Sequence, residues 1–131
     1  MAVPATALRI LRVVYGLFFL AIGVAVLVWL LTGLGSPPTQ PNAEAQAFTD
    51  ALTRSRIIDP LLAISYVVGG AALLRDRTAP LGLVLLAPSV LVIALFHLVL
   101  SGQWLIGLVV ALVFAVLAFA SRRRLSTLWA A

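Results

Sequence analysis

The chain has 131 residues, of which 63% are hydrophobic and only 10% are charged, and it contains no cysteine. An ordinary soluble domain is about one quarter charged, so this composition predicts an integral membrane protein rather than a soluble globule. The lack of cysteine excludes disulfides, thiol relays, thiolate-bound zinc and iron–sulfur clusters. All nine basic residues are arginine and the net charge is +5. Because they are scattered between apolar stretches, they indicate membrane topology rather than nucleic-acid binding.

The first predicted span covers residues 13–33, within a stretch from Val13 to Ala43 that carries no charge. A bilayer crossing takes about 20 residues, which this stretch exceeds. A cleaved signal peptide with Arg9 and Arg12 as its basic end is the alternative. Its apolar part, however, is usually only about 7 to 15 residues long.

Residues 34–56 form the only long connection, which begins rich in proline and continues as a helix-compatible segment. Asn42 is suited to cap this helix, and Asp50 and Arg54 are spaced to pair along it. Three apolar residues recur on one of its faces: Ala45, Phe48 and Leu52. We expect a short amphipathic helix at the outer membrane surface, which acts either as a lid over a cavity or as packing over the bundle end.

The second predicted span covers residues 57–74. Asp59 and Pro60 resemble an N-cap followed by a proline in the first turn. The span is slightly short for a bilayer, but Arg75 and Arg77 can extend it because their side chains reach the interface.

The stretch from Thr78 to Ser121 carries no formal charge and is about twice the crossing length, so it predicts two spans, 79–100 and 103–121. The break falls at the polar triplet 101–103, which contains a glycine. Pro88 lies inside the third span and predicts a modest kink.

The arginines indicate the orientation, since basic residues are retained on the cytoplasmic side. Two arginines, Arg54 and Arg56, lie in the outer loop, whereas seven lie at the other helix ends: Arg9, Arg12, Arg75, Arg77, Arg122, Arg123 and Arg124. We therefore expect a single-domain, all-α, four-transmembrane-helix bundle with both termini cytoplasmic. The aromatic residues are placed at interfaces: Trp29 and Trp104 outside, Tyr15 inside and Trp129 beyond the inner end.

No acidic or basic residue lies deep in the predicted spans, which argues against proton-coupled export and charged channels. The remaining candidates are His97 and Tyr66, whose predicted depths are close enough for one small ligand, together with Ser65. The hypothesis is an outward-facing pocket for the polar head of a quinone. The alternative is an interfacial His and Tyr without a ligand, and Ser65 bonded within its own helix. No second metal ligand lies at helical spacing from His97, so no metal site is expected.

Small residues in the first two spans, Gly16, Gly23 and the Gly69-Gly70 pair, predict close helix packing. Packing within the bundle and association into a homo-oligomer are both compatible with them.

The run 59–70, then residues 79–81 and 85–88 leading to His97, resembles the DoxX-like family, and the likeness covers about residues 48–100. The resemblance implies a small four-helix membrane protein linked to membrane redox systems, including quinone-linked oxidoreductases. Where family members commonly carry Lys, Glu and Asn, this chain has Ala63, Tyr66 and Val92. Of that polar set only His97 remains, so the resemblance implies a partner rather than a catalyst.

We therefore expect a bacterial plasma-membrane protein that serves, without catalysis of its own, as an accessory or anchoring subunit of a quinone-linked oxidoreductase. Its expected partners are the lipid bilayer and a membrane or peripheral redox protein. Two alternatives stay open. One is a quinone-reactive subunit that uses His97 and Tyr66 as proton partners. The other is a transporter or permeability factor for a small neutral or lipophilic molecule, kinked at Pro88 and gated by the outer loop.

Overall fold

The computed structural model describes residues 3–128 and residue 130, so Trp129 lies outside the described residues. The described part is helical and contains no β-strand. Its elements in chain order are α1 (Ala5–Thr32), α2 (Ala43–Ser55), α3 (Ile58–Leu73), α4 (Ala79–Leu95), the π-helix η1 (Phe96–Leu100), α5 (Trp104–Ala120) and α6 (Arg122–Leu128).

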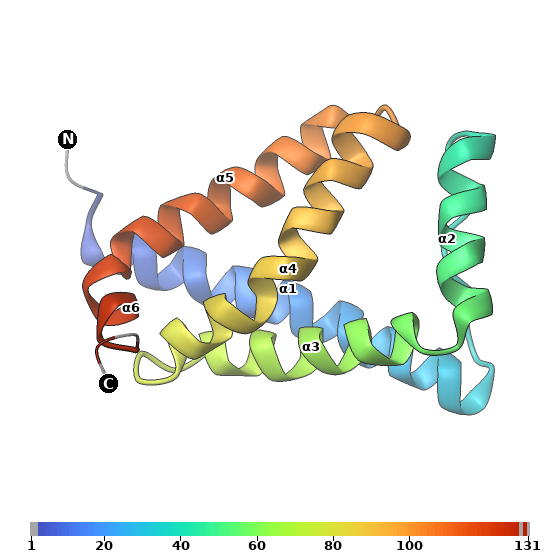
Figure 1. Cartoon of the computed structure of the whole chain (residues 1–131). Helices are drawn as coiled ribbons and strands as arrows, with labels where there is room; N and C mark the ends of the chain where they lie inside the picture. Colours follow the sequence, from blue (N-terminus) through green and yellow to red (C-terminus); the bar gives the residue numbers. More distant parts are fainter. Residues whose placement is uncertain (1–2, 129, 131) are drawn as a thin grey trace.

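The four long helices pack in chain order around one core (Figure 1). Helices α1 and α3 run side by side along the molecule, α4 packs on α3, and α5 packs on α4 and touches α1. Helix α2 stands at the end where α3 begins, and α6 lies at the opposite end, where α1 begins. Buried side chains from all four long helices fill the core: Tyr15, Phe19, Tyr66, Leu73, Leu83, Leu86, Val90, Val110 and Leu117.

Glycines allow α1 and α3 to approach closely. A Cβ atom added to Gly70 would lie 2.7 Å from both the carbonyl oxygen of Gly16 and the backbone nitrogen of Leu20. Gly23 faces the carbonyl oxygen of Ala63 in the same way, at 2.9 Å. Because the opposing atoms belong to the backbone, they cannot move aside for a side chain. The prediction that small residues pack within the bundle is confirmed.

Two helical segments are long and apolar enough to cross a membrane, Ala5–Thr32 and Ala79–Leu100. The number rises to four if each bent pair forms one span: α2 with α3, bent by 91°, and α5 with α6, bent by 74°. Helices α3 and α5 have 16 and 17 residues, which corresponds to about 24 to 26 Å at the α-helical rise. Each is therefore somewhat shorter than the hydrocarbon core of about 30 Å.

The outside of these helices is covered by large apolar side chains. Leu17 of α1, Leu91 of α4 and Leu112 of α5 are 49%, 61% and 54% exposed, respectively. A contiguous apolar surface of this kind is unfavourable in water and favourable against lipid tails. The fold is therefore that of a helical protein compatible with a membrane.

The loop helix is confirmed as α2. The side chain of Asn42 caps it by accepting a hydrogen bond from the Ala45 amide at 2.8 Å. The predicted pairing of Asp50 with Arg54 is wrong, because Asp50 accepts a hydrogen bond from Gln46 one turn earlier. The turn into α3 contains Arg56 in the left-handed region, at φ 57°.

One predicted helix cap needs correction, and two helical regions extend beyond the predicted spans. Helix α1 extends back to Ala5, so the predicted span 13–33 begins inside it, and Arg9 and Arg12, which are good helix formers, lie within the helix before that point. Asp59 is not an N-cap: α3 starts at Ile58, and the Asp59 carboxylate accepts a hydrogen bond from the hydroxyl of Thr53. The fourth span ends at Ala120 near the predicted place, but the arginines that follow it form α6.

Helix α4 continues through Pro88, and its ribbon changes direction part-way along (Figure 1). Proline leaves the carbonyl four residues earlier without a helical donor. Leu85 is the next residue along the helix. Its carbonyl oxygen accepts a hydrogen bond from Ser65 Oγ at 3.0 Å. The expectation that Ser65 bonds within its own helix is wrong, because a carbonyl of the neighbouring helix next to the proline is within its reach.

Candidate functional site

Tyr66, a candidate ligand-binding residue, lies in the core. It is 9% exposed, and its ring packs against that of Phe19 with the centroids 5.4 Å apart. Its hydroxyl takes part in no side-chain hydrogen bond between described residues, and it is not a fully buried unpaired atom, since Arg12 Nε alone is of that kind in the described chain. Tyr66 therefore faces α1 at the centre of the bundle.

His97 lies in the π-helix η1, and its side chain contacts the segment that joins η1 to α5. Its Nδ1 lies 3.0 Å from the hydroxyl oxygen of Ser101, which also accepts a hydrogen bond from the backbone amide of Gln103. The imidazole packs edge-on against Phe96, with the ring centroids 5.1 Å apart. Ser101 is 5% exposed, so this hydroxyl orients His97 from a buried position.

The described residues show no hydrogen bond or ring contact that joins Tyr66 to His97. Ser65 is joined to Leu85 of α4. Each of the three candidates thus has a contact of its own in the described chain: Phe19 for Tyr66, Ser101 for His97 and Leu85 for Ser65. Within the described chain, no group of three or more His, Asp or Glu side chains could hold a metal ion.

Helix α2 is attached to the π-helix that carries His97. The amide of Asn42 donates a hydrogen bond to the carbonyl oxygen of Leu100 at 2.8 Å, and the rings of Phe48 and Phe96 lie 5.6 Å apart. The same Asn42 side chain caps α2 through its oxygen. One residue thus joins the loop helix to the end of the third apolar segment.

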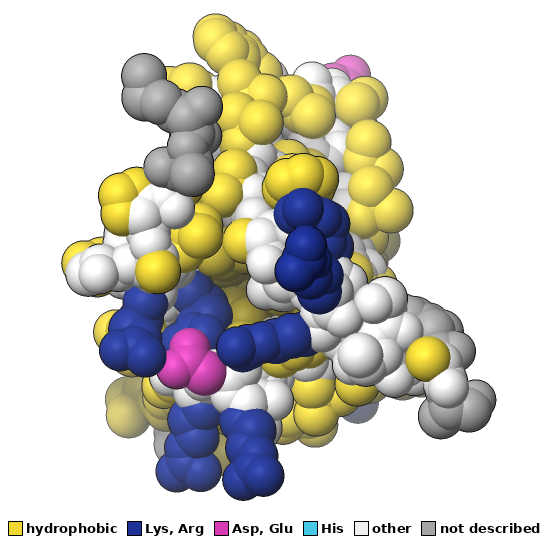
Figure 2. All heavy atoms as spheres, turned by 90° about the vertical axis from the view of Figure 1, so that its left-hand side faces the viewer, with side chains coloured by type: hydrophobic (Ala, Val, Ile, Leu, Met, Phe, Trp, Pro, Cys, Tyr) yellow, Lys and Arg dark blue, Asp and Glu magenta, His cyan; other side chains and the backbone are white. Residues whose placement is uncertain are grey.

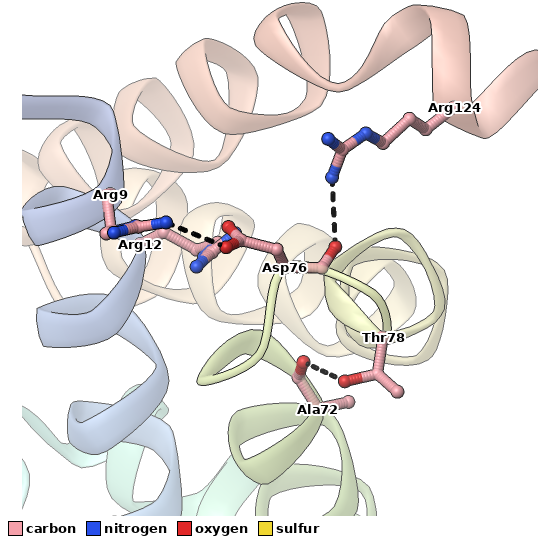
Figure 3. Close-up of polar contacts among 6 residues, drawn as sticks. All are labelled: Arg9, Arg12, Ala72, Asp76, Thr78 and Arg124. Carbon is pink, nitrogen blue, oxygen red and sulfur yellow. Dashed lines mark hydrogen bonds and ion pairs between the residues drawn. The ribbon is translucent and has the colours of Figure 1, made fainter. Parts of the chain in front are cut away.

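A second polar group, which sequence reasoning missed, lies at the end of the molecule where α1 begins (Figure 1), and Figure 3 shows its contacts. We call Arg9, Arg12, Asp76 and Arg124 the arginine cluster. Arg9 Nη2 donates to Asp76 Oδ2 at 3.0 Å, and Arg12 Nη1 donates to Asp76 Oδ1. Arg124 Nη1 donates to the backbone carbonyl oxygen of Asp76 at 3.0 Å. The cluster therefore joins α1, the α3–α4 connection and α6.

The electrostatics of the cluster centre on the carboxylate. Arg12 lowers the pKa of Asp76 below its ordinary value of 3.8, first through its hydrogen bond and then through its charge, and Arg9 adds to the effect. A hydrogen bond also spans the α3–α4 connection, in which the hydroxyl of Thr78 donates to the carbonyl oxygen of Ala72 at 2.7 Å. One feature of the sequence could have indicated this cluster: Asp76 is the only acidic residue outside residues 44–59, and it lies among the arginines assigned to one end of the helices.

The fold and these contacts define an all-helical protein with apolar helices compatible with a membrane and a polar cluster at one end of the bundle. The chain matches no family model, no curated protein and no solved structure.

Proposed function

We propose that this protein crosses the bacterial plasma membrane four times, through α1, α3, α4 with η1, and α5. It serves there as a non-catalytic accessory or anchoring subunit of a quinone-linked oxidoreductase. Both termini lie on the cytoplasmic side.

The observation that carries the accessory role is that polar side chains within the helices join the helices to each other. Tyr15 Oη donates to the carbonyl oxygen of Val110 at 2.9 Å, which joins α1 to α5. Ser65 joins α3 to α4 through Leu85 at 3.0 Å. Hydrogen bonds of this kind hold membrane helices together. A scaffold or anchor needs such contacts, whereas a proton relay needs groups that are free to exchange protons.

The arginine cluster supports the proposed orientation. Its contacts bring the start of α1, the α3–α4 connection and α6 to one end of the bundle. Seven of the nine arginines belong to these segments. The other two, Arg54 and Arg56, lie where α2 ends and α3 begins. This is the end of α3 that is opposite to the arginine cluster. Retention of arginine on the cytoplasmic side then favours one orientation for all four helices.

The redox assignment is supported by the resemblance of residues 48–100 to the DoxX-like family. In this proposal a quinone headgroup binds near His97 and Tyr66 without chemistry from the chain. The catalytic electron donor belongs to a partner protein.

Extraction from native membranes in mild detergent tests the proposal. We expect mass spectrometry of the purified sample to find a stoichiometric redox protein, with or without quinone. A protein that copurifies with bulk phospholipid alone would contradict the accessory role. Flux measurements in liposomes would then test transport of a small neutral or lipophilic molecule.

Quinone binding is tested separately by measuring the quinone retained per folded protein. We expect His97→Ala and Tyr66→Phe each to reduce retention without lowering the folded yield. Tyr15→Phe is the matched control, since it removes the other tyrosine hydroxyl of the chain, which is already bonded to Val110. Equal retention in all variants would remove the quinone site from the proposal.

A further inference from the structure

Two hollows flank Asp76 and Arg124 at the end of the bundle where the arginine cluster lies. The first has a volume of about 530 Å³ and lies between α1, α5 and the α3–α4 connection, with Arg9, Arg12 and Leu117 in its lining. The second, of about 440 Å³, lies between α4 and α6 and is lined in part by Leu81 and Leu128. Both share Asp76 and Arg124 as lining residues.

The charge around these hollows is positive. Arg9 and Arg12 share the single carboxylate of Asp76, whereas Arg124 contacts only the backbone carbonyl oxygen of that residue. Arg77 lines the second hollow as well. Figure 2 shows several arginine side chains gathered around one acidic side chain on this face, with hydrophobic side chains beside them. Asp76 therefore neutralises only part of the positive charge.

The guanidinium groups also retain unused hydrogen-bond donors. An arginine side chain carries five N–H donors, and Arg124 uses one of its terminal nitrogens on the backbone of Asp76. Nε of Arg12 is buried and has no hydrogen-bond partner among the described residues. A buried donor of this kind is costly unless an acceptor reaches it. The donors and the positive charge together suit an oxyanion with several acceptor oxygens.

The walls of the hollows change from charged to apolar over a short distance. Leu8 and Leu117 lie beside Arg9 and Arg12 in the first hollow, and Leu81 and Leu128 lie beside Arg77 and Arg124 in the second. Helix α6 turns by 74° from α5, so it lies across the end of the bundle. A phospholipid changes from charged to apolar in the same way, since its phosphate headgroup continues into acyl chains. Basic pockets between membrane helices are known to bind such headgroups.

We propose that the arginine cluster binds a phosphate oxyanion, supplied by the headgroup of an anionic phospholipid or by free phosphate. Arg124, Arg9 and Arg12 donate hydrogen bonds to the phosphate oxygens, and the Asp76 carboxylate competes with the phosphate for Arg9 and Arg12. This site lies at the opposite end of the bundle from His97. It depends on neither the redox partner nor quinone.

The test uses the full chain purified in an uncharged detergent, and thermal unfolding is followed during titration. The probes are short-chain phosphatidylglycerol, short-chain phosphatidylcholine and inorganic phosphate, with sodium chloride at matched ionic strength as the baseline. We expect phosphatidylglycerol or inorganic phosphate to raise the unfolding temperature above the chloride baseline and above phosphatidylcholine. Stabilisation by phosphatidylglycerol alone identifies a lipid as the source, and stabilisation by phosphate alone identifies free phosphate.

Matched variants separate the site from general attraction between charges. Arg124→Gln removes a lining guanidinium and should weaken binding about tenfold, the loss expected for one charge-assisted hydrogen bond. Arg123→Gln removes the same charge from the same helix, at a residue that lines neither hollow, and should leave binding unchanged. Arg9→Gln is a second test, since Arg9 is 67% exposed and its replacement should disturb the fold little.

Asp76→Asn should change the affinity for the oxyanion in the opposite direction from the arginine variants. If the cluster binds an oxyanion, loss of the competing carboxylate should tighten binding. The proposal is overturned if neither anionic probe stabilises the protein beyond chloride, or if phosphatidylcholine acts as strongly as phosphatidylglycerol. Equal loss of binding in Arg124→Gln and Arg123→Gln would also overturn it, because the arginines would then act only through total charge.

Discussion

At the scale of single residues, Asp76 connects more elements than any other charged group described. It binds Arg9 and Arg12 of α1 through its carboxylate and Arg124 of α6 through its carbonyl. Its side chain is 51% exposed, so solvent screens the ion pairs and their contribution to stability is modest. Its importance lies in fixing the relative positions of three chain segments.

Acid should weaken these ion pairs. The pKa of Asp76 is lowered in the folded protein, chiefly by Arg12. The stabilisation is therefore fully present above the unfolded pKa of about 3.9. It is lost as the pH falls through the lower folded value. We expect the unfolding temperature to drop below about pH 4 in the wild type, with a smaller drop in Asp76→Asn. Thermal unfolding across this range checks the prediction, and identical pH profiles would contradict it.

The two tyrosines of the core should differ in their response to loss of the hydroxyl. Tyr15→Phe removes the hydrogen bond to Val110 and should lower the free energy of unfolding by about 0.6 to 1.7 kcal/mol. Tyr66→Phe should change it little, because the Tyr66 hydroxyl takes part in no side-chain hydrogen bond between described residues and is not a fully buried unpaired atom. Unfolding titrations in mixed detergent micelles measure both values. A larger loss for Tyr66→Phe would show that its hydroxyl has a partner of its own.

At the scale of elements, the third apolar segment departs most from a regular α-helix. It holds Pro88 in its middle and ends in the π-helix η1. The backbone carbonyls at these two places receive donors from other elements, Ser65 at Leu85 and Asn42 at Leu100. Polar side chains of neighbouring elements thus bond to backbone carbonyls beside both irregular places, and contacts of this kind help irregular helices to be tolerated at membrane depth.

Asn42 should control both α2 and its attachment to η1, and two substitutions separate these roles. Asn42→Ala removes the cap and the hydrogen bond to Leu100, whereas Asn42→Ser keeps a capping oxygen and removes only that bond. Loss of an N-cap costs about 1 kcal/mol, so we expect about fivefold faster hydrogen exchange in the first turn of α2 for Asn42→Ala. Asn42→Ser should leave that turn protected. Hydrogen exchange with mass spectrometry checks this, and equal exchange in the two variants would contradict the capping role.

At the scale of the whole molecule, the main prediction is orientation. The chain contains no cysteine, so single cysteines can be introduced without removing others. Ser55 and Ser126 are both exposed and lie near opposite ends of the bundle, in α2 and α6. An impermeant thiol reagent added to intact cells should label Ser55→Cys and spare Ser126→Cys until the cells are opened. The reverse pattern would overturn the proposed topology.

Depth along a helix does not by itself specify which neighbours the candidate residues contact. Tyr66 and His97 have similar expected depths when residues are counted along their helices. Side chains also turn by about 100° per residue around an α-helix, and that direction decides which neighbour they meet. Tyr66 turns toward Phe19 of α1, and His97 toward Ser101 in the segment before α5. Sequence spacing could not reveal either partner.

The sequence by itself determined the approximate positions of α2 and of the four apolar helices, because long charge-free stretches, the break at 101–103 and the Asn42 cap act locally. It also determined that α1 and α3 could meet closely, since Gly16 and Gly70 have no side chain to separate them. Only the tertiary structure decided the partners of Asp76 and Ser65. Arg9 and Asp76 are 67 positions apart, and Ser65 and Leu85 are 20 apart. Contacts over such separations depend on which helices are neighbours and how each is turned, and no local pattern encodes that choice.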